Sequence, residues 1–83
     1  MDAETLYKRE QLHVVLTKVC GFPAGYGRSL GALDDLLTAY AAARLTLRHQ
    51  EVLVARLGNY GELVLRVLAD AAAENPAFTL NVQ

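Results

Sequence analysis

Apolar residues return every three or four positions over four stretches of this chain, which is the period of a helix with one buried face. The first stretch covers residues 9–20 and the second covers 29–42, while a weaker one follows at 50–57. The strongest runs from 59 to about 75 and carries the longest apolar stripe. The pattern therefore predicts three helices, whereas 50–57, with eight residues and no clear cap, is left open as a helical turn.

Residues that favour helix ends lie at the borders of these stretches. Gly21 is a natural stop for the first helix, and the Ser29 hydroxyl can accept a hydrogen bond from an amide in the first turn of the second. Asn59 and Glu62 have the spacing of a capping box, so we expect both to cap the last helix. Pro76 should end that helix, because proline disfavours helical backbone in the residue before it.

Two short stretches alternate apolar and polar residues instead, as half-buried strands do. They are 45–48 and 78–82, and a weaker, clipped first strand is predicted at 3–7. Strands separated by helices favour right-handed crossovers and a parallel sheet with helices packed on it. The chain is thus expected to be an α/β protein.

Length and net charge limit the classes of function that the chain can have. Eighty-three residues fit one domain, 1–83, with a small core. Eight Lys and Arg against nine Asp and Glu give a net charge of −1, which provides no field for a nucleic-acid backbone. We therefore expect no direct nucleic-acid ligand.

Cysteine content and hydropathy bear on the compartment. The single cysteine, Cys20, excludes an internal disulfide, and a small domain without one fits a reducing compartment. The first residues lack the apolar core of a signal peptide, and no apolar run is long enough to span a membrane. These features predict a cytoplasmic protein without a membrane partner.

No residue pattern points to catalysis, a metal or a cofactor. His13 and His49 have no third ligand at metal spacing, so they are expected to be ordinary surface or half-buried histidines. The glycines around Tyr26 lack the Lys-Ser or Lys-Thr ending of a phosphate-binding loop. Asp34 and Asp35 are adjacent, so in a helix they point about 100° apart and rarely converge on one substrate atom. A non-enzyme is expected.

The stretch 21–38 has the most distinctive pattern. Glycines and Pro23 bend its first half into a loop, and a helix begins after Ser29. One side of that helix gathers Leu30, Leu33, Leu36, Leu37 and Tyr40, and the other carries Gly31, Asp34, Asp35 and Thr38. Carboxylates near a helix N-terminus are favoured by its dipole, so the two aspartates are either a solvated face or a site for a cationic partner.

The same stretch resembles the barstar-type inhibitors of small secreted ribonucleases. The likeness rests on a Pro-x-x-Tyr-Gly loop at 23–27 that leads into Ala-Leu-x-Asp-x-Leu at 32–37. It continues through Leu12-His13, Leu45-Thr46-Leu47, Glu62, Val64-Leu65, Val67, Asp70-Ala71, Glu74 and Phe78-Thr79-Leu80. The resemblance implies a small barstar-like fold, with a short three-stranded parallel sheet and about four helices.

The resemblance also implies an inhibitory mechanism. The loop 23–29 and the helix 29–42 would plug the active site of a cognate extracellular, guanyl-preferring, barnase-like ribonuclease, with acidic side chains as phosphate mimics. The main carboxylate falls on Asp35, with the neighbouring hydroxyl on Thr38 and a further acidic contact on Asp70. The expected contact residues are Gly25, Tyr26, Arg28, Gly31, Asp34, Asp35, Thr38 and Asp70, and the free chain is expected to be a monomer.

Three positions depart from the family pattern. Gly31 replaces an aspartate at the helix start, Gly25 replaces the first of two loop tyrosines, and Asp34 replaces a tryptophan. Aromatic residues are enriched at interface hot spots, so these changes bear on the partner more than on the fold. The alternative is therefore a barstar-like binding module or immunity protein for a partner that is not a ribonuclease.

Overall fold

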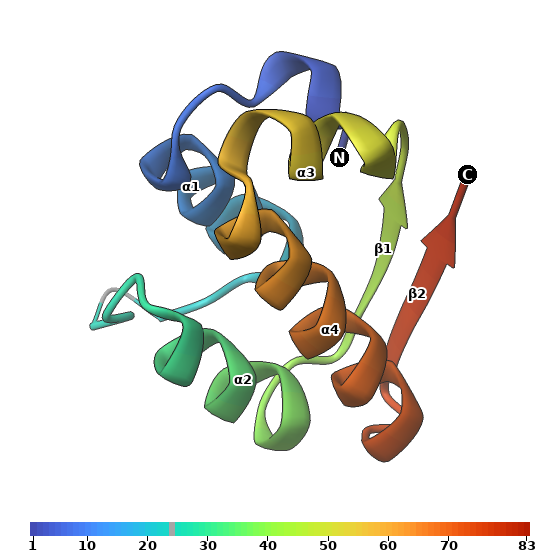
Figure 1. The fold of residues 1–83 in the computed structure, drawn as a ribbon. Helices are drawn as coiled ribbons and strands as arrows, with labels where there is room; N and C mark the ends of the chain where they lie inside the picture. Colours follow the sequence, from blue (N-terminus) through green and yellow to red (C-terminus); the bar gives the residue numbers. More distant parts are fainter. Residues whose placement is uncertain (24) are drawn as a thin grey trace.

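The computed structural model describes residues 1–23 and 25–83 (Figure 1). The three predicted helices are present within these residues; the first has the predicted bounds, whereas the second ends at Ala39 rather than at 42. The stretch 50–57, which the sequence left open, is also a helix. None of the described helices is both long enough and apolar enough to cross a membrane. In order, the elements are η1 Ala3–Thr5, α1 Arg9–Cys20, α2 Leu30–Ala39, β1 Ala43–Leu47, α3 Gln50–Leu57, α4 Asn59–Glu74 and β2 Phe78–Val82.

The sheet has two parallel strands, so the α/β class is confirmed while the prediction of a third strand at 3–7 is wrong for the described residues. A single bridge joins Asp2 to Arg48 beyond the end of β1, and the Ala3 amide donates to the Arg48 carbonyl at 3.0 Å. The Asp2 carboxylate then accepts from the Glu4 amide at 3.0 Å. This cap turns the chain into the 3-10 helix η1 and ends the pairing.

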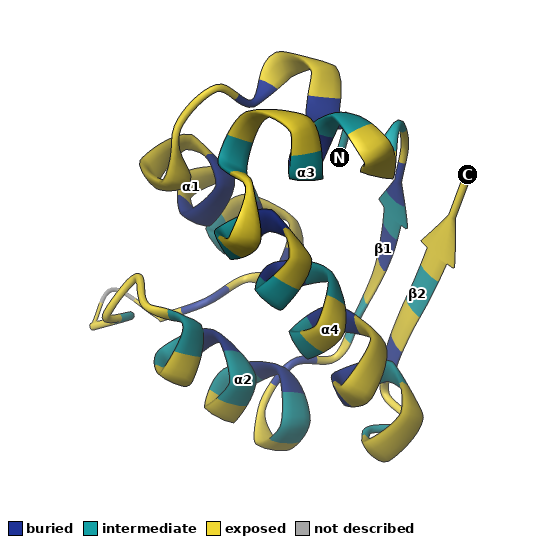
Figure 2. Ribbon diagram, viewed as in Figure 1, coloured by how far each residue is buried: buried dark blue, intermediate teal, exposed yellow. Residues whose placement is uncertain are grey.

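The core lies between the helices and the sheet. Helix α2 packs against α4, α3 packs against α4, and α1 packs against β1 (Figure 1). The buried residues lie on the inner faces of these elements (Figure 2). Among the fully buried side chains are Leu12 and Leu16 of α1, Leu33 and Leu37 of α2, Leu45 and Leu47 of β1, Leu53 of α3, and Val64 and Leu68 of α4.

Three predicted helix ends are confirmed and one is wrong. Helix α4 ends at Glu74 with Asn75 as its C-cap, as expected from Pro76. Gly21 ends α1 with a left-handed backbone (φ 67°), and the Ser29 hydroxyl accepts from the Ala32 amide at 3.1 Å. The capping box at Asn59 does not form, because α4 has no side-chain cap and Asn59 is already helical. Gly58, with φ 59°, makes the whole connection between α3 and α4.

Candidate functional site

Helix α2 presents one polar face to solvent. Gly31, Asp34, Asp35 and Thr38 share this face because helix positions three, four and seven apart lie above one another. Asp35 is exposed, while Asp34 and Thr38 are half-buried. On the opposite side, Leu33 and Leu37 have no exposed surface. The polar face is therefore carried by a helix that its leucines anchor in the core.

The two aspartates lie beyond the first turn of α2, although the helix begins after Ser29 as expected. Asp34 and Asp35 are the fifth and sixth residues of α2, and the first turn of α2 contains no acidic residue. The field of a helix N-terminus falls off within the first turn, so the predicted dipole stabilisation of these carboxylates is weak. Thr38 donates its hydroxyl to the Asp34 carbonyl at 2.7 Å, which leaves the hydroxyl oxygen as an acceptor.

The two glycines that depart from the family pattern lie in open positions. A Cβ atom built on Gly25 or on Gly31 would meet no heavy atom within 4 Å, and neither residue has a positive φ. The fold would therefore accept a side chain at both positions. Ala24, within the predicted contact loop 23–29, lies outside the described residues.

Tyr26 is held inward by a buried histidine. His13 of α1 is only 2% exposed, with its Nδ1 2.5 Å from the Tyr26 hydroxyl and its Nε2 2.6 Å from the Tyr60 hydroxyl. A neutral imidazole donates through one nitrogen and accepts through the other, so one tyrosine hydroxyl accepts and the other donates. This cluster joins the loop to α1 and α4. The expectation of a surface or half-buried histidine is wrong for His13.

The protonation of this cluster follows from its burial. Desolvation, helped by the nearby Arg28 charge, lowers the pKa of His13 below its ordinary value. Burial is also the main cause that raises the pKa of Tyr26 to about 12. Both rings are therefore neutral at pH 7. Cys20 is buried as well, and desolvation raises the pKa of its thiol, so the thiol is not activated as a nucleophile.

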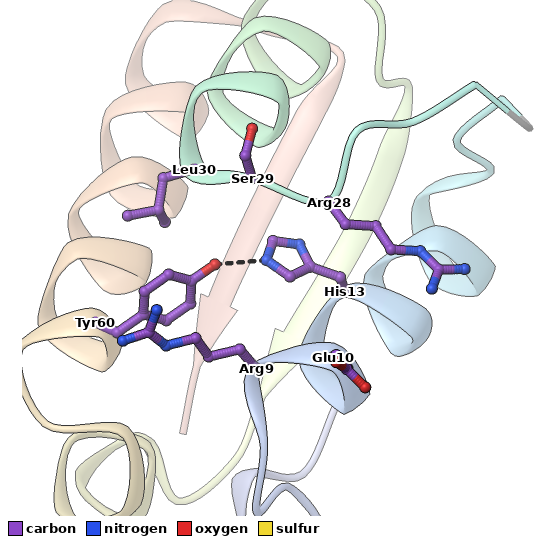
Figure 3. A pocket seen from close by; sticks show the side chains of 7 residues that line it. All are labelled: Arg9, Glu10, His13, Arg28, Ser29, Leu30 and Tyr60. Atoms are coloured by element: carbon purple, nitrogen blue, oxygen red, sulfur yellow. Dashed lines mark hydrogen bonds between the residues drawn. The ribbon is translucent and has the colours of Figure 1, made fainter.

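A pocket of about 400 Å³ lies where the loop enters α2 (Figure 3). Arg28, which precedes the Ser29 cap, is exposed and has a left-handed backbone with φ 53°. The Arg9 guanidinium carbon lies 4.2 Å from the centre of the Tyr60 ring. The pocket thus carries two cations, Arg9 and Arg28, and one carboxylate, Glu10. It is lined by Arg9, Glu10, His13, Arg28, Ser29, Leu30 and Tyr60.

Asp70 is carried by α4 rather than α2. It is exposed and lies roughly 1.4 helical turns before Asn75. The side-chain amide of Asn75 donates to the Leu37 and Ala41 carbonyls at 2.7 and 2.8 Å, so it closes the C-terminal end of α2. Asp70 is therefore at the end of α4 that lies beside the end of α2, whereas Arg28 is at the opposite, N-terminal end.

Sequence reasoning missed His13, Tyr60 and Asn75 as positioning residues. A histidine on an apolar helix face was a usable signal, because a buried imidazole needs two polar partners. The sequence does not show that Tyr26 and Tyr60 supply them, since Tyr60 is 47 residues from His13 along the chain. The sequence predicts only that the helix ends before Pro76, whereas the side-chain amide of Asn75 donates to backbone carbonyls 34 and 38 residues away.

Known proteins place the chain in a family. It matches the family described as "Barstar (barnase inhibitor)" over residues 1–83. It is also 37% identical over 76 residues to a protein of Bacillus subtilis (strain 168) named "Putative ribonuclease inhibitor YrdF", which covers 89% of this chain and 84% of that protein. The chain belongs to the barstar family.

Proposed function

We propose that this chain inhibits a small secreted microbial ribonuclease by filling its active site with loop 23–29 and helix α2. Membership of the barstar family over the whole chain supports the proposal, as does the name of the related Bacillus protein. We further propose that the enzyme is barnase-like and guanyl-preferring. The chain acts by binding and not by catalysis, as a cytoplasmic, monomeric single domain that protects the producing cell.

Asp35 is the centre of the proposed mechanism. Its exposed carboxylate takes the place of a substrate phosphate, because both groups present oxygens that arginine binds in similar geometry. Asp34 and Thr38 flank it on α2, and Asp70 contributes from α4. The single observation that carries the proposal is this exposed Asp35 on a helix whose opposite leucines are fully buried.

The loop supplies the second part of the surface. Arg28 and Gly25 are exposed, whereas Tyr26 is half-buried and its hydroxyl is bonded to His13. Tyr26 therefore offers the exposed part of its ring to a partner. Because the cluster orders the loop before binding, less conformational freedom is lost on association.

Arg28 and the three departures from the family pattern favour a second candidate, a partner that is not a ribonuclease. Gly25 and Gly31 are exposed and their side-chain positions are open, so nothing in the fold requires them to be glycine. Their small size suits a partner surface of different shape. Co-purification from the producing organism distinguishes the two: a bound ribonuclease supports the first candidate, and another bound protein supports the second.

The decisive test replaces Asp35 with alanine. Removing one partner of a buried interfacial charge pair costs about 2 to 5 kcal/mol of binding free energy, a range that partly comes from the founding inhibitor of this family. We expect a loss of this size in titration calorimetry against the cognate ribonuclease, with unchanged circular dichroism. Asp34→Ala should cost less if that half-buried side chain lies at the rim of the interface, and Asp70→Ala should fall between the two.

Glu51→Ala is the matched control, since it removes an exposed carboxylate of α3. Its inhibition should equal that of the parent chain. If Asp35→Ala inhibits as tightly as the control, the phosphate-mimic mechanism is wrong and the second candidate is favoured.

A further inference from the structure

Three potential metal ligands converge where the chain begins. Asp2 and Glu4 come from the N-terminal segment, and His49 joins β1 to α3. The Nδ1 atom of His49 is 3.0 Å from a carboxylate oxygen of Asp2 and 3.0 Å from one of Glu4. The three ligand atoms all lie within 4.8 Å of one another.

A single proton on His49 Nδ1 cannot satisfy both carboxylates well. The Nδ1–H of His49 can point along only one line, yet two carboxylate oxygens stand at the same 3.0 Å from it. Two carboxylates also carry two negative charges, whereas an imidazolium carries one positive charge. A divalent cation would satisfy a lone pair on each of the three atoms and balance both acids.

Two of the three spacings between ligand atoms are close to those around such an ion, and the third is within 4.8 Å. Zinc binds imidazole nitrogen and carboxylate oxygen at about 2.0 to 2.2 Å, which in tetrahedral geometry puts neighbouring ligand atoms roughly 3.3 to 3.6 Å apart. The two separations of 3.0 Å are within a few tenths of an ångström of the lower end of that range. The His49 side chain is 38% exposed, so water can reach the remaining coordination position.

We propose that His49, Asp2 and Glu4 bind a divalent transition-metal ion of the zinc class, with water completing its coordination. One imidazole and two carboxylates are a donor set that zinc accepts. On binding, the Nδ1 lone pair forms the metal bond and the Nδ1 proton passes to solvent. The sequence gives no hint of this set, because 45 to 47 residues separate His49 from the two acids.

The surroundings hold two of these groups in place. The Oδ1 atom of Asp2 accepts from the Glu4 amide, which orients the carboxylate as outer hydrogen bonds orient metal ligands. The Arg56 guanidinium donates to the carbonyls of Ala3, Glu4 and Leu6, which fixes η1 against α3. Glu51 and Arg48 add one charge of each sign nearby.

A bound ion would tie the N-terminal segment to the turn between β1 and α3. Only the folded chain brings these ligands together, so the ion should stabilise the fold in proportion to the logarithm of its concentration. In Figure 1 this region lies at the opposite end of the molecule from α2. The proposal is therefore independent of the inhibitory function.

The test titrates zinc chloride into the chelator-treated chain, with calorimetry and thermal unfolding as readouts. We expect one ion per chain and a melting temperature that rises with zinc. His49→Gln and Asp2→Asn should each weaken binding at least tenfold; Asn also favours N-caps, so η1 can still form in the second variant. Glu74→Gln, which removes an exposed carboxylate of α4, and Cys20→Ser if it folds, should bind zinc as the parent does.

Nuclear magnetic resonance separates this site from any other. The chain has two histidines, and His13 is buried with both ring nitrogens occupied, so it serves as an internal reference. Substoichiometric zinc should shift or broaden the His49 ring signals and leave those of His13 unchanged. Equal affinity in His49→Gln, or no zinc-dependent change in the parent chain, would overturn the proposal.

Discussion

Two helical glycines show how differently two regions of this molecule are constrained. Gly31, in the first turn of α2, is exposed, and a Cβ atom there would meet no heavy atom within 4 Å. Gly61, in the first turn of α4, is buried, and a Cβ atom there would lie 2.6 Å from the Leu53 carbonyl oxygen of α3. One helix face is open, whereas the other touches a neighbouring backbone.

The two glycines mark two kinds of region, the packed corner between α3 and α4 and the proposed recognition face of α2. Gly58 joins α3 to α4 with a positive φ of 59°, so the two helices leave this corner in close contact, and Gly61 makes that contact possible. The face of α2 has no such requirement, because only its leucine side packs inward. Substitutions at the corner should therefore change stability, and substitutions on the α2 face should change binding.

The largest expected effect is at the corner. Gly61→Ala should lower the free energy of unfolding by about 2 kcal/mol, because the clash involves backbone that cannot move aside and overpacking costs about 3 kcal/mol in such a case. The better helix propensity of alanine offsets about 1 kcal/mol of the strain at most. Urea unfolding followed by circular dichroism measures the change. A variant as stable as the parent would show that α3 and α4 can separate freely.

The next effect is in the cluster that fixes the loop. Tyr26→Phe removes the hydroxyl that faces His13 Nδ1, leaving a buried nitrogen without its partner, which costs about 1 to 3 kcal/mol. Tyr40→Phe is the matched control, since Tyr40 is 58% exposed. Both are compared by urea unfolding, and equal stability of the two variants would contradict the structural role of the cluster.

A smaller effect should follow acidification. The pKa of His13 is lower in the folded chain than in the unfolded chain, so the unfolded chain binds more protons as pH falls below about 6.5. The stability that neutral His13 contributes is present above that pH and is lost as pH falls through its folded pKa. Unfolding experiments at pH 7.5 and 5.5 measure this change in stability. They are best done in the His49→Gln variant, because His13 is then the only histidine that titrates. Greater stability at pH 5.5 would contradict a buried neutral His13.

The smallest effect is at the open glycine. Gly31→Ala should stabilise the chain by about 0.5 to 1 kcal/mol, because glycine loses more backbone entropy in a helix and no atom obstructs the new methyl group. Its binding should change separately from its stability, and calorimetry with the partner reports that. Destabilisation instead would mean that this face is packed more tightly than the structure shows.

Local signals accounted for most of the fold. Ser29 begins α2 and Gly21 ends α1 as expected, because each makes a hydrogen bond to backbone within four residues along the chain. The predictions failed where distant contacts decide. Residues 3–7 were expected to pair as a strand, but the Asp2 side chain caps a 3-10 helix there. Asn59 was expected to cap α4, but Gly58 is the single residue between α3 and α4, so Gly58 is the N-cap and Asn59 is already helical.

The candidate site also has features that local sequence predicts and features that depend on distant contacts. The grouping of Gly31, Asp34, Asp35 and Thr38 on one face follows from helical periodicity alone. The inward orientation of Tyr26 does not, since it depends on a histidine 13 residues earlier and belongs to a cluster that also includes Tyr60. The pocket beside Arg28 likewise combines α1, the loop and α4, which no local pattern brings together.

Both ends of α2 are fastened by groups that lie off its polar face. Ser29 caps the start, and the Asn75 side chain, from beyond α4, bonds the Leu37 and Ala41 carbonyls at the end. Substitutions on the polar face should therefore leave α2 folded, so under the proposed function the binding specificity can change one residue at a time. The same arrangement makes α2 suitable for randomised libraries, with positions 31, 34, 35 and 38 varied and both fastenings kept.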